Sequence, residues 1–405
     1  MATITENIQT LRSIKSDIKN AITDKGGNVG NDFKTYAQAI TNLPSGGGGG
    51  GTEIEDALVM RELSEYSNDR ISVVGDYAFA TCGNLTSVNL QNCSYIGSSA
   101  FFLCSGLATI NIPLCKTINS YGFAFCWSLT SANLPNCTSI NNYGFIGCSS
   151  LTSVNLPNCS YIGSQAFAYC KSLSYVDLPN CSYAGSLAFS GGGVQSVNLP
   201  LCTSIGTSIF LYCSLLTYVN LQNCSSFGES VFSPCFNLTS VSLQNCKYLG
   251  YETFKGCSVL PSISLPNCIS IGYATFSDCK ALSYIDLPLC TVIGTYAFTY
   301  CITLSLIISP LCTSISNYAF YGCSNLKEIY LNSVTTVTTI LSSTFYNCPN
   351  LTSVYVPSSL VDAFKTAQYW SSISDKIVAY REIAVSPDEG NHGIGEGGDA
   401  GIEID

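Results

Sequence analysis

Apolar residues recur through most of this 405-residue chain with a period of about 22 residues. The most regular copy runs from Leu151 to Ser172 and reads LTSVNLPNCSYIGSQAFAYCKS. Val154 and Leu156 alternate with polar residues, as in a strand, and Pro157 then ends the strand. Each of 13 copies is therefore predicted to form one turn of a solenoid with parallel strands. Their leading residues are Leu85, Leu107, Leu129, Leu151, Leu173, Val194, Leu216, Leu238, Leu260, Leu282, Leu304, Leu326 and Leu351.

The second half of each copy carries a phenylalanine, such as Phe101 or Phe167. One copy alone cannot bury a Phe, a Leu and two Cys, so we expect stacked copies to bury them as continuous columns. A Gly or Asn recurs a few residues before the Phe, as at Gly97, Asn119 and Gly163. This choice of residues predicts a backbone position with positive φ.

The 23 cysteines recur every 11 residues, from Cys82 to Cys181 and again from Cys202 to Cys323, which gives two per copy. A zinc site would need closely spaced pairs, and the chain contains no CxxC. Stacked cysteines could pair as disulfides, but we favour packing as small buried apolar residues. The columns have a few gaps, at Gly191 in one and at Val334 and Ser359 in the other.

The strings of the LTSVNLPNCSYIGSQAF type resemble the BspA-like leucine-rich repeats over about 290 residues. Residues 354–380 resemble the helical cap of such arrays, and Leu360, Val361, Phe364 and Trp370 could shield the last turn. We therefore expect a β-rich, right-handed leucine-rich-repeat solenoid with a parallel sheet, a small N-terminal helical segment and a C-terminal helical cap. The resemblance implies binding of proteins or glycans and does not specify a ligand.

The expected organisation has five parts. They are a helical anchor or oligomerisation segment (1–44), a Gly-rich linker (45–52), the solenoid (53–359), the cap (360–386) and an acidic Gly-rich tail (387–405).

The N-terminal segment has an apolar stripe with helical spacing, which needs a partner because a short helix is marginal alone. The stripe consists of Ile4, Ile8, Leu11, Ile18 and Ile22. It could pack on itself as a hairpin or serve for attachment and oligomerisation. Residues 17–48, DIKNAITDKGGNVGNDFKTYAQAITNLPSGGG, resemble N-terminal segments of tailed-phage virion proteins. This resemblance implies attachment to other virion proteins, with a trimer expected by analogy.

Composition and charge narrow the choice of partners. Only 10% of the residues are charged, and the net charge of -10 comes mainly from the tail. We expect no nucleic-acid partner because there is no basic stripe. We expect no membrane insertion because no apolar run reaches about 18 residues. The start of the chain shows no secretory signal, which favours a virion location over a bacterial cell surface.

Catalytic chemistry is not expected. The only histidine, His392, lies in the acidic tail, where it cannot form a positioned triad. We therefore predict no catalytic residues, no metal site and no cofactor, and an enzyme that uses the groove is the least favoured hypothesis.

The ligand-binding candidates lie at matched places on the predicted strand face, where tyrosine could contact sugars or proteins. They are Tyr175, Asp177, Tyr218, Asn220, Tyr284 and Asp286. The alternative is an ordinary wetted sheet that uses Tyr for its β propensity. The favoured hypothesis is a phage fibre or appendage that binds a host surface glycan or protein. The alternative is a secreted or cell-surface adhesin.

Overall fold

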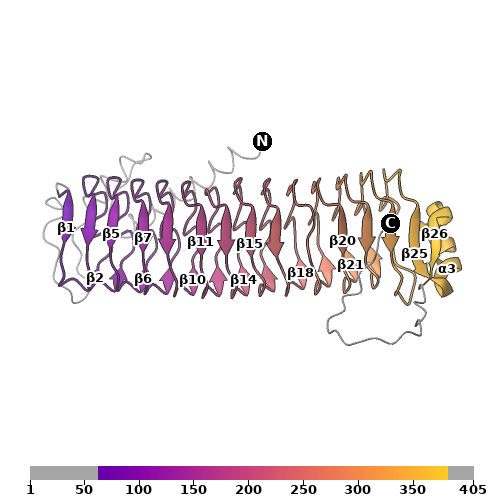
Figure 1. Ribbon diagram of the computed structural model, residues 1–405, viewed down its shortest axis with the longest axis horizontal. Coiled ribbons are helices and arrows are strands. Elements are labelled where there is room, and N and C mark those ends of the chain that lie inside the picture. Colours follow the sequence, from indigo (N-terminus) through magenta and orange to yellow (C-terminus); the bar gives the residue numbers. More distant parts are fainter. Residues whose placement is uncertain (1–62, 382–405) are drawn as a thin grey trace, which may run out of the picture.

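A computed structural model of the chain describes residues 63–381, which form one parallel β solenoid of about 14 turns. Figure 1 shows the turns stacked along a single long axis with the helical cap at one end. The anchor segment with its five-residue stripe, the linker and the acidic tail lie outside the described residues. The predicted fold is confirmed, with one more turn than the 13 counted, because Leu63 precedes a first strand as Leu85 precedes the second.

All turns but one contribute a short strand to face A, and neighbouring strands pair in register, for example Ser87 with Thr109. The face A strands are β1 (Glu65–Ser67), β3 (Ser87–Asn89), β5 (Thr109–Asn111), β7 (Ser131–Asn133), β9 (Ser153–Asn155), β11 (Tyr175–Asp177), β13 (Ser196–Asn198), β15 (Tyr218–Asn220), β17 (Ser240–Ser242), β20 (Tyr284–Asp286), β22 (Leu306–Ile308), β24 (Glu328–Tyr330), β25 (Ser353–Pro357) and β26 (Ile377–Tyr380). Their middle residues point inward and their outer residues face solvent, which is the alternation that the sequence predicts.

A second set of strands forms face B, with the same parallel register from turn to turn. These strands are β2 (Val73–Val74), β4 (Tyr95–Ile96), β6 (Thr117–Ile118), β8 (Ser139–Ile140), β10 (Tyr161–Ile162), β12 (Tyr183–Ala184), β14 (Ser204–Ile205), β16 (Ser226–Phe227), β18 (Tyr248–Leu249), β19 (Ser270–Ile271), β21 (Val292–Ile293) and β23 (Ser314–Ile315).

The third side of each turn is a run of tight turns, which we call the turn wall and define by residues 97–104 and their equivalents. Its backbone also bonds from turn to turn: the N–H groups of Ser99, Phe101 and Leu103 donate to carbonyls of the next turn over 2.8–2.9 Å. Ser99 and Leu103 have φ values of 54° and 58°, and equivalent residues in most other turns are also positive. Backbone hydrogen bonds therefore join neighbouring turns on all three sides.

The prediction of positive φ at the recurrent glycine is wrong. Gly97 and Gly185 lie outside the left-handed region, and positive φ falls two and six residues later. These glycines are needed because adjacent turns approach closely: a Cβ on Gly185 would lie 2.6 Å from the backbone nitrogen of Ser164. The requirement is one of space between turns rather than of backbone conformation.

Gly185→Ala is therefore expected to destabilise the solenoid by about 1–3 kcal/mol, because the neighbouring turn must move. Gly250→Ala is the matched control, since a Cβ there meets nothing within 4 Å. Thermal unfolding followed by circular dichroism would compare the two variants. An equal loss of stability in both would contradict the close-approach explanation.

The core consists of stacked columns, as the sequence predicts. Phenylalanines stack without interruption from Phe79 to Phe345, with ring centroids 4.8–5.8 Å apart. Tyr66 closes the column at its first end. Trp370 closes it at the other end, and its indole N–H donates to the carbonyl of Thr338 over 2.7 Å.

The end of the array is covered by η2 (Ser358–Leu360), α3 (Val361–Thr366) and η3 (Trp370–Lys376). Phe364 and Trp370 are buried there, while Leu360 and Val361 pack against the core and stay partly exposed. The expected helical cap differs in one respect: its last residues form β26, which extends face A beyond β25.

Two positions in the cysteine columns need correction. Gly192, not Gly191, occupies the cysteine place of its turn, because its N–H donates to Phe189 as the N–H of Cys170 donates to Phe167. This copy is one residue shorter than most others, and the missing residue falls after Gly193. Counting back from Val194 therefore placed the gap in the cysteine column one residue too early. Val334 does lie buried in the other column, whereas Ser359 lies exposed in η2.

Face A is interrupted between β17 and β20. In regular turns the residue before the strand donates its N–H to the previous turn, as Thr239 does to Thr217 over 3.0 Å. The equivalent residue in the next turn is Pro261, which has no N–H. Residues 262–264 therefore form no strand, although Ile263 remains buried.

Candidate functional site: tyrosine surfaces of the solenoid

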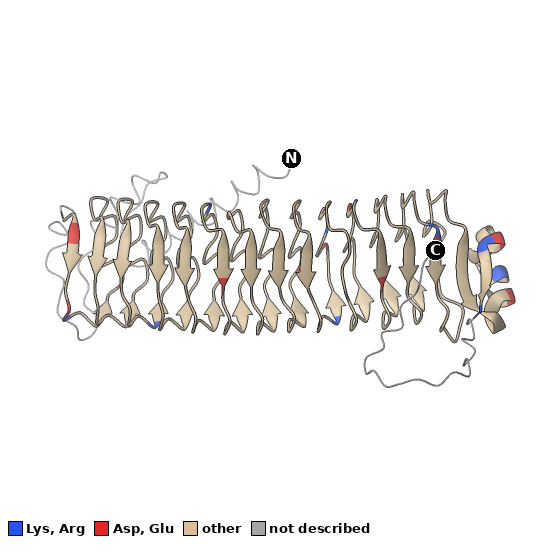
Figure 2. Cartoon of the chain, viewed as in Figure 1, with Lys and Arg blue, Asp and Glu red and all other residues tan. Residues whose placement is uncertain are grey.

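The surface of the described solenoid is nearly free of charge. Figure 2 shows isolated charged residues along the turns and a closer group of them on the cap helix. Within residues 63–381 no group of three or more His, Cys, Asp or Glu side chains is arranged to hold a metal ion. In the same residues no helix is long and apolar enough to cross a membrane. The described surface therefore offers mainly hydroxyl, amide and aromatic groups.

The cysteine thiols act as packing groups in both columns. In the turn wall, Cys104 donates its thiol to the carbonyl of Phe79 over 2.9 Å, and other turns repeat this contact. In the other column, Cys93 donates to the carbonyl of Tyr95 over 3.2 Å. None of the 23 cysteines forms a disulfide in the structure, and all but Cys348 are buried. Burial raises the pKa of Cys213 to about 12, which disfavours the reactive thiolate.

The tyrosines predicted for ligand binding lie exposed on face A. Tyr175, Tyr218 and Tyr284 each begin a face A strand and are 53%, 40% and 48% exposed. Tyr175 and Tyr218 share one four-stranded sheet with Ser196 between them. Tyr284 lies beyond the interruption at Pro261, in the next sheet. The structure thus brings two of the three tyrosines near each other and keeps the third apart.

The polar candidates at the strand ends belong to ladders of side-chain hydrogen bonds. Asn220 donates its amide to Asn198, which in turn donates to the carboxylate of Asp177, both over 2.8 Å. Asn155 and Asn133 form the same contact in earlier turns. Asp286 is partly removed from water, which raises the pKa of its carboxyl. Asp177 and Asn220 therefore have a structural role in joining turns as well as an exposed position.

A second aromatic surface, which was not predicted from the sequence, lies on the turn wall. Toward the cap, tyrosines of successive turns contact one another, and we call this set the tyrosine strip. It consists of Tyr251, Tyr273, Tyr296, Tyr318, Tyr321 and Tyr346, with ring centroids 4.9–5.8 Å apart. The repeated Tyr-Ala-Phe triplet at Tyr296 and Tyr318 was the available signal, because it places a tyrosine two residues before the core phenylalanine in successive turns.

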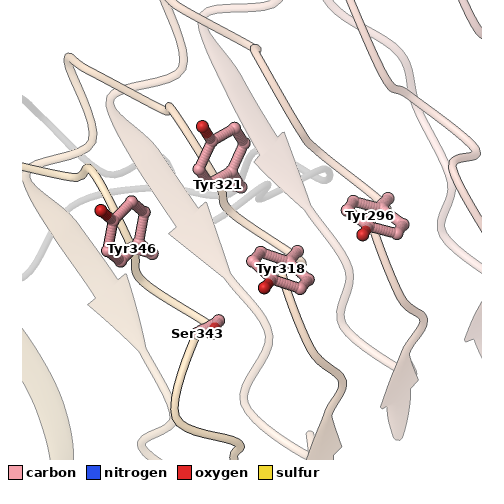
Figure 3. A pocket seen from close by; sticks show the side chains of 5 residues that line it. All are labelled: Tyr296, Tyr318, Tyr321, Ser343 and Tyr346. Atoms are coloured by element: carbon pink, nitrogen blue, oxygen red, sulfur yellow. The ribbon is translucent and has the colours of Figure 1, made fainter.

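An open groove of about 380 Å³ lies at the cap end of the tyrosine strip and is lined by Tyr296, Tyr318, Tyr321, Ser343 and Tyr346. Figure 3 shows two rows of rings, with Tyr296 and Tyr318 in one row and Tyr321 and Tyr346 in the other. The ring planes of Tyr318 and Tyr321 lie at 84° to each other, so the rings of one row are oriented almost perpendicular to those of the other. A hydrogen bond with Tyr300 raises the pKa of the Tyr321 hydroxyl. The groove thus combines aromatic walls with hydroxyl groups and has the volume of a small-ligand site.

Comparison with known proteins supports the repeat assignment. The family described as "BspA type Leucine rich repeat region" matches residues 72–191, 138–260 and 247–374. No curated protein matches the sequence.

Several solved structures are similar to this chain. A leucine-rich repeat protein from Bacteroides ovatus is 24% identical, with a TM-score of 0.46, over 77% of this chain and 88% of that one. A leucine-rich cell surface protein from Faecalibacterium prausnitzii is 25% identical, with a TM-score of 0.42, over 77% and 91%. The leucine-rich repeat protein of T. pallidum is 24% identical, with a TM-score of 0.35, over 52% and 82%.

Proposed function

Because the chain belongs to the BspA-type leucine-rich repeat family, we propose that it is a non-enzymatic binding protein whose solenoid presents recognition surfaces to a partner. The observation that carries this proposal is the groove of the tyrosine strip on an otherwise nearly uncharged array. Backbone hydrogen bonds between turns on three sides fix the spacing of the backbone that carries its rings. A preformed surface of this kind loses little conformational entropy when a partner binds.

We further propose that the protein is a fibre or appendage of a tailed-phage particle. Residues 1–44 would attach the chain to other virion proteins and would also allow it to form a trimer. The solenoid would bind a host surface glycan or protein. The support is the resemblance of residues 17–48 to N-terminal segments of phage virion proteins. The six glycines Gly46–Gly51 add to it, since a glycine run of this kind is typical of linkers that join an attachment segment to a binding domain.

Mass spectrometry of purified particles of the phage that encodes the chain tests this proposal. We expect peptides of the solenoid in the particle at a fixed ratio to other structural proteins. Deletion of residues 1–44 is expected to abolish incorporation and to leave the solenoid folded, as judged by circular dichroism. Absence of the full chain from the particles would refute the virion role.

A bacterial cell-surface or secreted adhesin is the second candidate. The observation that favours it is the family itself, because BspA-type repeat proteins are often found at cell surfaces. Surface labelling of the cell that encodes the chain separates the candidates. Labelled protein on uninfected cells would support the adhesin, whereas labelled protein confined to released particles would support the virion role.

A further inference from the structure

The tyrosine column of the turn wall ends one ring short of the cap. Tyr296 and Tyr318 stack at 5.1 Å and 4°. The hydrogen bond from the N–H of Phe320 to the carbonyl of Thr344 fixes the register of the next turn and puts Ser343 at the place equivalent to Tyr318. A small side chain thus stands where a third ring would continue the stack. One face of the Tyr318 ring is left without a ring against it in this column.

The other row of the strip bounds this vacancy on its side. Tyr321 and Tyr346 stack at 5.7 Å and 11°, and Tyr346 is 63% exposed. Because the ring planes of the two rows are nearly perpendicular, the space beside Ser343 is bounded by the ring of Tyr318 on one side and by that of Tyr346 on another (Figure 3). The vacancy therefore has the shape and size to accept one ring of a ligand.

The charge of the surroundings limits the chemistry of that ligand. The three turn-wall segments around the groove, residues 294–301, 316–323 and 341–348, contain no charged residue. In the preceding turn Asp278 is paired with Lys280 at 3.7 Å. An anionic or cationic ligand would lose hydration here without meeting an opposite charge. The groove instead suits a neutral ligand with an apolar ring face and several hydrogen-bonding groups.

Building on the binding role proposed above, we propose that this groove binds a neutral, hexose-containing glycan, with one sugar ring stacked on Tyr318 above Ser343. A hexose ring presents C–H groups on its faces and hydroxyls around its edge. Those hydroxyls both donate and accept hydrogen bonds, as do the hydroxyls of Tyr296, Tyr346 and Ser343. A proline-rich peptide could also pack against tyrosines, but its prolines have no N–H and offer only carbonyl acceptors. The glycan therefore matches the groove better.

Ser343→Tyr tests the proposal because it supplies the missing ring and fills the vacancy. We expect the full-length wild-type chain to bind at least one neutral glycan on an array of neutral and anionic oligosaccharides. The affinity of Ser343→Tyr for that glycan, measured by calorimetry, is expected to be at least tenfold lower. The matched control is Ser153→Tyr, which adds the same side chain on exposed β9 of face A and is expected to bind as the wild type does.

Other outcomes overturn the proposal. Undiminished binding by Ser343→Tyr would do so, and loss of binding in Tyr218→Ala instead would move the site to face A. Binding of a polyproline peptide with no bound neutral glycan would assign the groove to peptides.

Adsorption of the purified chain to host cells distinguishes a failure of the groove proposal from a failure of the proposed binding function. If the wild type and Ser343→Tyr adsorb equally, the groove proposal fails and the binding function stands, whereas no adsorption by the wild type refutes the binding function itself.

Discussion

Raising the pH from about 8 to about 11 is expected to unfold the solenoid cooperatively, because its thiols are buried in the neutral form. Burial raises the pKa of Cys159 and Cys290 to about 11 and that of Cys213 and Cys257 to about 12, from an ordinary value of 9.0. A thiol pKa that is higher in the folded chain stabilises the fold fully below the unfolded pKa. That stabilisation is lost as the pH rises through the folded pKa.

The size of the effect follows from the number of such thiols. One pH unit above its unfolded pKa, each thiol has lost about 1.4 kcal/mol of stabilisation. Most cysteines of both columns share the shift, and a few of them together equal the roughly 5–15 kcal/mol that stabilises a typical protein. The solenoid is therefore expected to be far more sensitive to alkali than a protein with few buried thiols.

Circular dichroism and the ultraviolet absorbance of thiolate, recorded on the same reduced sample, would follow this transition. We expect the two signals to change together, and the fold to return on neutralisation in the presence of a reductant. Native circular dichroism that persists at about pH 11 would refute the prediction.

Removing one ring from the phenylalanine column is expected to give the largest effect of any single substitution. Phe167→Ala should lower the free energy of unfolding by about 3–5 kcal/mol, because the buried ring stacks on Phe145 and Phe189 and the cavity cannot collapse. Since each turn contacts only its neighbours, the variant is also expected to unfold in two steps, one for each side of the defect.

Phe236→Ala is the matched control for this substitution. This substitution removes the same kind of side chain from a position that is 52% exposed. It is expected to lower the free energy of unfolding by less than about 0.5 kcal/mol. Urea unfolding of both variants would measure the difference. Similar losses in the two variants would show that the phenylalanine column is not the main source of stability.

The fold could be predicted from the sequence because its pattern is repeated many times. Each turn gives an independent reading of the same Leu, Phe and Cys positions, so an irregular turn such as the one with Gly192 does not disturb the assignment. The first turn was missed because Leu63 and Tyr66 match the pattern only partly. The interruption at Pro261 depends on one absent N–H group, which the apolar pattern does not record.

The groove was less accessible to sequence reasoning for a physical reason. Tyr318 and Tyr346 occupy different places within their turns, and they come together only because the turn wall folds tightly. The recurrent glycine was misread for a related reason. Glycine serves both for positive φ and for close approach, and only the distance between neighbouring turns distinguishes the two.

The restriction of hydrogen bonds to neighbouring turns has a consequence for how the protein is made. Contacts such as those between Asn111 and Asn89 join residues 22 apart, and even the contact of Trp370 with Thr338 spans only 32. No part of the described array has to wait for a distant segment before it can fold. A turn can therefore acquire its partners as soon as the next turn leaves the ribosome, and the exposed end of a growing array is always the most recently synthesised turn. The helical cap, synthesised after the last turn, then covers that final exposed end.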